Sequence, residues 1–188
     1  MTILEGKPGS GKSLMAMAYL FNQLEKGYLD KLYLFCNPVA VRGAARLGFY
    51  PGTKDDKLLD SAVGNFLTAK IGDRYYVEQL IERGQIILIP MADCRGIDVG
   101  TDSHACIYIT EAQNMSIDLM KLALQRAGNN CQVILDGDVE AQLDSPEYGG
   151  LNNGLRRTSE VFKGTNLFGK VNLKKVYRSR LAAIADEL

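Results

Sequence analysis

The stretch GKPGSGKS at residues 6–13 matches the pattern GxxxxGK[ST] at every fixed position. It follows TILE at 2–5, which predicts a short strand, and it opens an amphipathic segment, 12–26, which predicts a helix ended by Gly27. Glycines let the backbone N–H groups of such a loop turn toward an anion, and the helix N-terminus adds a partial positive charge. Strand, loop and helix together favour a phosphate-binding loop over an unliganded Gly-rich turn.

Each residue type in this loop has an expected task. We expect the ammonium group of Lys12 to reach the β- and γ-phosphate oxygens of a nucleoside triphosphate, and the hydroxyl of Ser13 to bind Mg²⁺. The predicted cofactor-binding residues of the loop are Gly6, Gly9, Ser10, Gly11, Lys12 and Ser13.

Apolar runs alternate with amphipathic segments along the rest of the chain. Strands are predicted at 31–36, 85–89, 105–110, 131–135 and 167–173, and helices at 58–69, 75–83, 116–127, 151–162 and 179–188. Strands that alternate with helices are joined by crossovers and form a mainly parallel sheet with helices on both faces. We therefore expect an α/β fold of the P-loop NTPase type in a single domain, residues 1–188.

Composition and charge exclude several classes of protein. The 188 residues carry 22 Lys+Arg against 22 Asp+Glu, so net charge does not indicate a nucleic-acid or membrane partner, although balanced totals can hide a local basic surface. No apolar run approaches the roughly 18 residues of a membrane helix, and residues 1–5 do not resemble a signal peptide, so a cytoplasmic location is expected. The single histidine excludes a His-rich zinc site, and a Ser-His-Asp triad or a Cys-His pair would have to use His104.

A catalytic carboxylate is expected where a later strand ends, in the segment ACIYITEAQN at 105–114. Glu111 is the candidate general base for an attacking water, and Gln113 is the candidate sensor of the γ-phosphate. Thr110 stands before Glu111, and its neutral hydroxyl is a weaker Mg²⁺ ligand than a carboxylate. The predicted metal ligands are Ser13, Thr110 and Glu111.

An acidic loop, DGDVEAQ at 136–142, is expected directly after the strand at 131–135. Ligands bind beyond the carboxyl ends of the strands in open α/β sheets, so Asp138 and Gln142 are candidates to link phosphate sensing to a moving loop. A simple acidic turn is the alternative. Arg178 is a candidate phosphate-contacting arginine, within the subunit or toward a neighbour.

Together these segments resemble the PhoH-like family of P-loop ATPases, which are related to superfamily 1 helicases, over nearly the whole chain. The resemblance implies a RecA-like helicase core. It is carried by motifs in one order: GKPGSGKS at 6–13, NPVAV at 37–41 with GFYPG at 48–52, Arg95-Gly96, EAQN at 111–114, Arg126, Gly137-Asp138 with Gln142, GLR at 154–156, Glu160-Val161 with Lys163-Gly164, and VYR at 176–178.

The resemblance also implies roles and partners. It implies ATP and Mg²⁺ as cofactors, bound by Lys12 and Ser13. Glu111 would be the catalytic carboxylate, Gln142 would resemble the glutamine of the helicase GDxxQ motif, and Arg178 would be an arginine finger or sensor, so that the implied catalytic residues are Lys12, Glu111, Gln142 and Arg178. The implied partners are RNA or single-stranded DNA, together with further copies of the chain in a homo-oligomeric ring such as a hexamer.

Three features depart from the family pattern. Thr110 stands where the family usually has Asp, which weakens the predicted metal site, and Cys36-Asn37-Pro38 stands where the family has Thr-Arg-Pro. The chain also starts at its first strand, without the upstream segment that would contact adenine in relatives, as expected of a truncated or short phage-type member.

Two functions are therefore carried forward as hypotheses. The first is an ATPase that remodels RNA or single-stranded nucleic acid, since basic residues gather between Arg156 and Arg180; a solvated charged face explains these residues equally well. The second is a nucleotide-binding assembly or switch module with weak or no hydrolysis, because Thr110 replaces the usual Asp. A small-molecule kinase shares the phosphate loop but is disfavoured by the segments 111–114 and 137–142.

Overall fold

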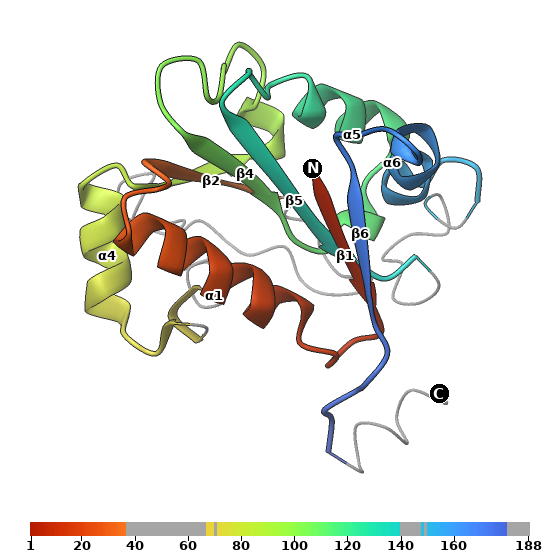
Figure 1. Ribbon diagram of the computed structural model, residues 1–188, viewed down its shortest axis with the longest axis horizontal. Helices are drawn as coiled ribbons and strands as arrows, with labels where there is room; N and C mark the ends of the chain where they lie inside the picture. The colour runs from red at the N-terminus through yellow and green to blue at the C-terminus, as the bar shows by residue number, and fades with distance from the viewer. Residues whose placement is uncertain (37–66, 70, 140–147, 149, 180–188) are drawn as a thin grey trace, which may run out of the picture.

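Strands and helices alternate along the chain, as the sequence predicts. The structure, a computed structural model, describes residues 1–36, 67–69, 71–139, 148 and 150–179 (Figure 1). Its elements in chain order are β1 (Thr2–Gly6), α1 (Lys12–Glu25), β2 (Lys31–Cys36), α4 (Arg74–Glu82), β3 (Ile86–Pro90), the 3-10 turn η1 (Met91–Asp93), β4 (Ala105–Ile109), the 3-10 turn η2 (Ala112–Asn114), α5 (Ile117–Leu124), β5 (Cys131–Gly137), α6 (Gly154–Phe162) and β6 (Gly169–Leu173).

The strands form one parallel sheet in the order β3-β2-β4-β5-β1-β6. The strand that feeds the phosphate loop, β1, lies between β5 and β6, with Leu4 opposite Asp136 and Gly6 opposite Leu173. The carboxyl ends of all the strands therefore meet at one edge of the sheet, which is where ligands bind in open α/β folds. The expected α/β fold of the P-loop NTPase type is confirmed.

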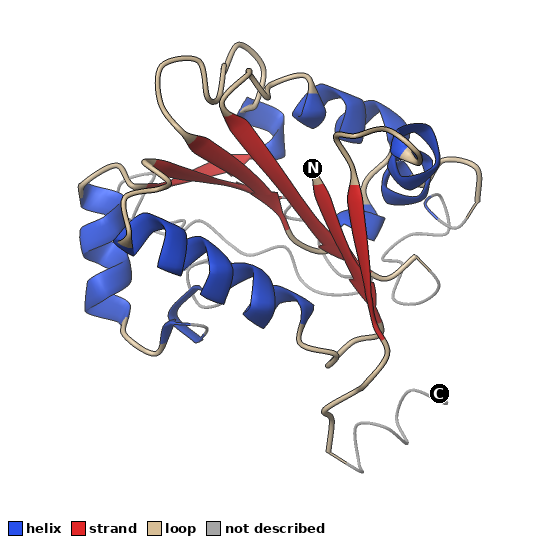
Figure 2. Cartoon of the chain, viewed as in Figure 1, coloured by secondary structure: helices blue, strands red, loops and turns tan. Residues whose placement is uncertain are grey.

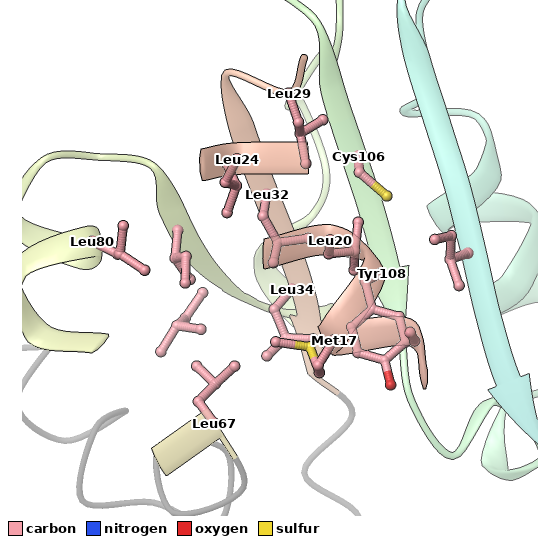
Figure 3. Packing of buried hydrophobic residues seen from close by; sticks show 14 of the residues in the cluster. Met17, Leu20, Leu24, Leu29, Leu32, Leu34, Leu67, Leu80, Cys106 and Tyr108 are labelled. Carbon is pink, nitrogen blue, oxygen red and sulfur yellow. The ribbon is translucent and has the colours of Figure 1, made fainter. Parts of the chain in front are cut away.

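Helices cover both faces of the sheet, with α1 and α4 on one face and α5 and α6 on the other (Figure 2). Side chains alternate between the two faces along each strand, so Leu34 packs toward α1 while Phe35 packs toward the opposite layer. Figure 3 shows Met17 and Leu20 of α1 against Leu34 and Tyr108 of the sheet. Each leucine buried in this way contributes about 1.5 to 3 kcal/mol relative to an exposed one.

Several boundaries differ from those that the sequence predicts. β5 continues two residues beyond the predicted end, so Asp136 and Gly137 belong to the strand and not to the acidic loop that follows it. The helix predicted at 151–162 begins at Gly154, because the side chain of Asn153 accepts a hydrogen bond from the backbone N–H of Arg156 and caps it. The helix predicted at 116–127 ends at Leu124.

Two predicted helices fall largely outside the described residues. Of the helix predicted at 58–69, residues 67–69 are described and are helical, and the one predicted at 179–188 lies almost wholly in the part that is not described. Among the helices that the structure describes, none has both the length and the apolar character needed to cross a bilayer.

Candidate functional site

The phosphate loop curls between β1 and α1 in a shape that demands glycine. Gly9 and Gly11 have left-handed φ angles of 78° and 89°, and the backbone N–H of Ser10 donates to the carbonyl of Lys7 at 3.1 Å. A Cβ added at Gly6 would lie 2.6 Å from the carbonyl oxygen of its neighbour in β6. The loop is therefore tightly curled, as in the glycine-rich loops whose backbone N–H groups bind phosphate.

Two side chains of the loop could bind a phosphate group. Lys12 is only 7% exposed, and its ammonium group donates to the carbonyl oxygens of Gly6 at 2.7 Å and Lys7 at 3.2 Å, so it lies folded over the loop. The hydroxyl of Ser10 is buried and has no hydrogen-bond partner within the described ranges. A buried hydroxyl without a partner costs free energy, and a phosphate oxygen would satisfy it.

A cavity of about 740 Å³ opens over the loop at the carboxyl edge of the sheet. It is lined by residues 8–15 of the loop and α1, by Glu111, and by Tyr177 and Arg178 from the segment after β6. The backbone N–H of Tyr177 donates to the carbonyl of Gly9 at 2.9 Å, and this bond holds that segment against the loop. Arg178 lies so close that a Cβ at Gly9 would come within 2.4 Å of its Cγ. The cavity thus combines cations, a helix N-terminus and one carboxylate.

The backbone holds Glu111 in an unusual conformation. Its φ is 51°, a left-handed value that no other non-glycine residue adopts in the described part of the chain, and it leaves the side chain exposed to the cavity. Such conformations cost about 1 to 3 kcal/mol and persist where the surroundings impose them. Here the backbone N–H of Glu111 donates to Asp136 Oδ1 at 3.2 Å and its carbonyl accepts from the N–H of Asn114 at 3.0 Å, so the backbone is held on both sides. The Gln113 Nε2 donates to Glu111 Oε2 at 2.6 Å and holds the carboxylate.

Gln113 itself lies behind the cavity. It is 1% exposed, and its Oε1 accepts a hydrogen bond from the backbone N–H of Asp138 at 3.2 Å. Its backbone carbonyl accepts another from Asn153 Nδ2 at 3.1 Å. The side-chain amide of Gln113 therefore links the end of β4 to the end of β5.

A buried polar cluster joins the ends of β4 and β5 on the face of the sheet covered by α1. The carboxylate of Asp136, which is fully buried, accepts hydrogen bonds from the Tyr108 hydroxyl, from Thr110 Oγ1 at 3.0 Å and from the Glu111 backbone N–H at 3.2 Å. Burial, followed by the charge of Asp136 and the hydrogen bond to it, raises the pKa of Tyr108 far above its usual range, whereas hydrogen bonds from Thr110 and Ser13 lower it. The phenol therefore remains a hydrogen-bond donor.

The structure brings some of the predicted site residues together and separates others. Residues 8–13 of the phosphate loop, Glu111 and Arg178 line one cavity, while Gly6, Thr110, Gln113 and Asp138 lie outside its lining. Gln142 lies outside the described residues. Sequence reasoning missed Tyr108 altogether and treated Asp136 only as part of an acidic loop. The available signal was a charged residue that directly continues the apolar run of 133–135.

The donor set fits a magnesium–nucleotide complex better than a metal site built from protein ligands alone. Within the described ranges, no group of three His, Cys, Asp or Glu side chains could hold a metal ion. Mg²⁺ in nucleotide sites takes its ligands mostly from water and phosphate, with one or two protein oxygens. Ser13, at the start of α1, and Glu111, which lines the same cavity, are oxygen donors of this kind.

Comparisons with known proteins identify the family of the chain. The profile of the family described as PhoH-like protein matches residues 1–187. Protein PhoH2 of Bacillus subtilis is 33% identical over 195 aligned positions, which cover 100% of this chain and 42% of that protein. Protein PhoH2 of Thermobispora bispora is 31% identical over 185 positions, which cover 97% of this chain and 41% of the relative.

A PhoH-like protein of Bacillus subtilis is 32% identical over 174 positions, covering 89% of this chain and 50% of its own length. The chain therefore spans half or less of the length of these relatives. Among solved structures, one described as an ATPase domain superposes with a TM-score of 0.37 at 13% identity, covering 77% of this chain and 61% of that one.

Proposed function

This chain is a member of the PhoH-like family and a P-loop nucleotide-binding protein, and from that premise we propose that it binds ATP with Mg²⁺ and hydrolyses it. The observation that carries the proposal is the convergence of Lys12, Glu111 and Arg178 on one cavity over the phosphate loop. A cation at the β- and γ-phosphates, a carboxylate for the attacking water and an arginine for the developing charge are the groups that phosphoryl transfer to water requires.

The loop binds and orients the triphosphate. Lys12 exchanges its bonds to the carbonyl oxygens of Gly6 and Lys7 for bonds to phosphate oxygens, and the hydroxyl of Ser10 gains the partner it lacks among the described residues. The backbone N–H groups at the N-terminus of α1 add their partial positive charge. Mg²⁺ bound with the nucleotide spreads the negative charge of the phosphates, and Ser13, Thr110 and Glu111 are its proposed ligands.

Glu111 takes the proton from the attacking water, and Gln113 positions the Glu111 carboxylate. The Gln113 amide bridges the Glu111 carboxylate and the backbone of Asp138, so the base is held in place before substrate arrives. Gln113 and Asp138 therefore act through Glu111 in this proposal. Arg178 lies against the phosphate loop of its own chain, which favours charge stabilisation within one subunit. The role of Gln142 in the same reaction rests on the family resemblance.

The test compares ATP turnover and nucleotide binding in wild type and Lys12→Ala, with Lys121→Ala as the matched control on the opposite face of the sheet. We expect Lys12→Ala to lose turnover by about 100-fold or more and Lys121→Ala to keep it, because only the first lysine lines the cavity. Wild-type turnover no higher than that of Lys12→Ala would contradict the proposal.

RNA or single-stranded DNA is the proposed macromolecular partner. Exposed basic side chains gather on α6 and on the segment after β6, where Lys174 and Lys175 lead directly to Tyr177 and Arg178 at the cavity. The ammonium of Lys175 stands 4.8 Å from the centre of the exposed Tyr177 ring. This arrangement offers phosphate contacts and a stacking surface beside the nucleotide site.

Binding of a single-stranded oligonucleotide, titrated against salt, tests this partner. Each phosphate contact contributes about −0.7 to the slope of log affinity against log salt for single strands. We expect Lys174→Ala to reduce the slope by about one contact and Lys121→Ala to leave it unchanged. A salt-independent affinity, or equal slopes in both variants, would remove nucleic acid from the proposal. Light scattering with and without ATP tests the proposed homo-oligomeric ring, which predicts a mass that is a multiple of 20.7 kDa.

A nucleotide-binding switch with weak hydrolysis is the second candidate, and the specific observation that favours it is Thr110 at the end of β4. Under this alternative, Thr110→Asp restores a carboxylate and raises turnover strongly. Unchanged or lower turnover in Thr110→Asp would count against it.

A further inference from the structure

The residue at position 136 lies closer to the phosphate loop than the residue at position 110. In the sheet, β5 separates β4 from β1, and Asp136 pairs directly with Leu4 of β1. Ile109 pairs with Leu135, so Thr110 follows beside Asp136 but stands two strands away from β1. Neighbouring strands are about 4.8 Å apart. A side chain at 136 is therefore one strand closer to the bound phosphates than a side chain at 110.

Asp136 also points to the face on which the metal would lie. Tyr108 and Ile134 belong to the core layer under α1, and alternation places Thr110 and Asp136 on that same face. The helix α1 begins at the phosphate loop, and Ser13 in its first turn lies close enough to the Tyr108 hydroxyl, which donates to Asp136, to lower the pKa of that phenol. The Asp136 carboxylate and the Ser13 hydroxyl thus share one neighbour.

The hydrogen bonds of Asp136 leave its negative charge uncompensated. Its partners are two hydroxyls and one backbone N–H, and no described residue forms an ion pair with it. Taking a carboxylate fully out of water costs several kcal/mol unless a cation compensates it. Neutral donors orient the group, and a divalent cation would supply the missing charge.

We propose that Asp136 supplies the carboxylate of the magnesium site, in place of the acid that is absent at position 110. Under this inference Thr110 is no longer one of the proposed Mg²⁺ ligands but a positioning residue, whose hydroxyl holds Asp136 Oδ1 while Tyr108 holds Oδ2. Compared with the family pattern, the carboxylate stands on the adjacent strand, at position 136 of β5, and a hydroxyl stands at position 110. This inference rests on the proposed binding of nucleotide with Mg²⁺, and it removes the reason to regard Thr110 as a crippling change.

The experiment measures the affinity of a fluorescent ADP with MgCl₂ and with EDTA, and the binding of Mn²⁺ by electron paramagnetic resonance with ADP present. The variants are Asp136→Asn, Tyr108→Phe and the exchange Thr110→Asp/Asp136→Thr. We expect Asp136→Asn to lose about tenfold or more of the Mg²⁺ enhancement while its affinity in EDTA stays within about twofold of wild type. Tyr108→Phe keeps the carboxylate but removes one of its donors, so it should lose less of the enhancement than Asp136→Asn. Cys106→Ala, at a fully buried position of β4 that forms no hydrogen bond with Asp136 in the described structure, should keep the wild-type enhancement and controls for a purely structural effect.

The exchange variant keeps one carboxylate and one hydroxyl and returns the carboxylate to position 110, where the family pattern places it, so it should restore the enhancement despite the greater distance from β1. If Asp136→Asn does not fold, the exchange variant provides the test of whether one carboxylate at this site is needed for the Mg²⁺ enhancement. A folded Asp136→Asn with the wild-type enhancement and Mn²⁺ signal, or a folded exchange variant without them, would overturn the proposal. Absence of Mg²⁺ enhancement in the wild type would instead contradict the proposed function. Thr110→Asp alone would add a second negative charge beside Asp136, so we expect no gain in turnover from it.

Discussion

One added methyl group at Gly137 should disturb both the core and the site. A Cβ there would lie 2.6 Å from Gln113 Oε1 and 2.6 Å from Leu155 Cδ2, whereas ordinary contact begins at 3.4 Å. Each of these atoms must retreat by about 0.8 Å. Gly137 lies in β5 and is not among the positive-φ glycines, so Gly137→Ala adds no backbone strain and its effect is steric.

The expected cost follows from what must move. Overpacking a filled core costs about 1 to 3 kcal/mol. If the Gln113 amide shifts, its bonds to Glu111 and to the Asp138 backbone weaken, and a buried polar group without its partner costs a further 1 to 3 kcal/mol or so. We expect Gly137→Ala to lower the free energy of unfolding by about 2 to 6 kcal/mol, which for a chain of this length lowers Tm by roughly 4 to 24 °C.

The matched control is Gly169→Ala in β6, where an added Cβ meets nothing within 4 Å. It should be neutral or stabilising by about 0.4 to 1 kcal/mol, because alanine restricts the unfolded chain. Urea unfolding followed by circular dichroism measures both variants. ATP turnover should fall in Gly137→Ala alone, since Glu111 loses its support, while nucleotide affinity stays within about twofold. Equal unfolding free energies for the two variants, within about 0.5 kcal/mol, would refute this reasoning.

Three further predictions concern stability and the phosphate loop. Burial raises the pKa of the Cys106 thiol above its ordinary 9.0, so the thiol ionises at lower pH in the unfolded chain than in the folded one. The contribution of this thiol to the free energy of unfolding is therefore complete below about pH 9 and falls above it by up to about 1.4 kcal/mol per pH unit. Urea unfolding measured from about pH 7 to 11 should show a shallower fall in the free energy of unfolding for Cys106→Ala than for wild type. Asn153→Ala should lower the free energy of unfolding by about 2 to 3 kcal/mol in thermal unfolding, and Ser116→Ala by about 1 kcal/mol. The reason is that Asn153 caps α6 and also donates to two carbonyl groups, whereas Ser116 only caps α5. Gly9→Ala should weaken nucleotide binding by about tenfold or more in calorimetry, since it imposes a φ of 78° on alanine and displaces Arg178. Adding Arg178→Ala to this variant should then lower the affinity little further. Fully additive losses of binding free energy would count against the contact between Gly9 and Arg178.

Local patterns were sufficient for most elements of the fold. Residues 6–13 are contiguous, and their glycine spacing encodes a loop whose shape depends on its own backbone, so the phosphate site could be predicted directly. The strands came from apolar runs, and their parallel pairing came from the helices between them. The errors lie at boundaries such as the end of β5, where an aspartate follows an apolar run and resembles the start of a loop.

Arg178 shows what local reasoning leaves undecided. Its contact with Gly9 depends on β6 lying next to β1, a pairing between residues more than 160 positions apart. Gln113 is a similar case, since the sequence offered it as a phosphate sensor and the fold buries it against Glu111 and Asp138. Composition and spacing say which chemical groups are available, but not which of them face each other.

The sequence by itself determined that this chain carries a nucleotide phosphate loop in an α/β fold, because both signals reside in short contiguous segments with their own backbone preferences. Only the tertiary structure decided where the carboxylates stand. The strand order β4-β5-β1 puts Asp136 next to the loop strand and leaves Thr110 beyond it. Strand order arises from the packing of distant segments, and residue types along the chain do not record it.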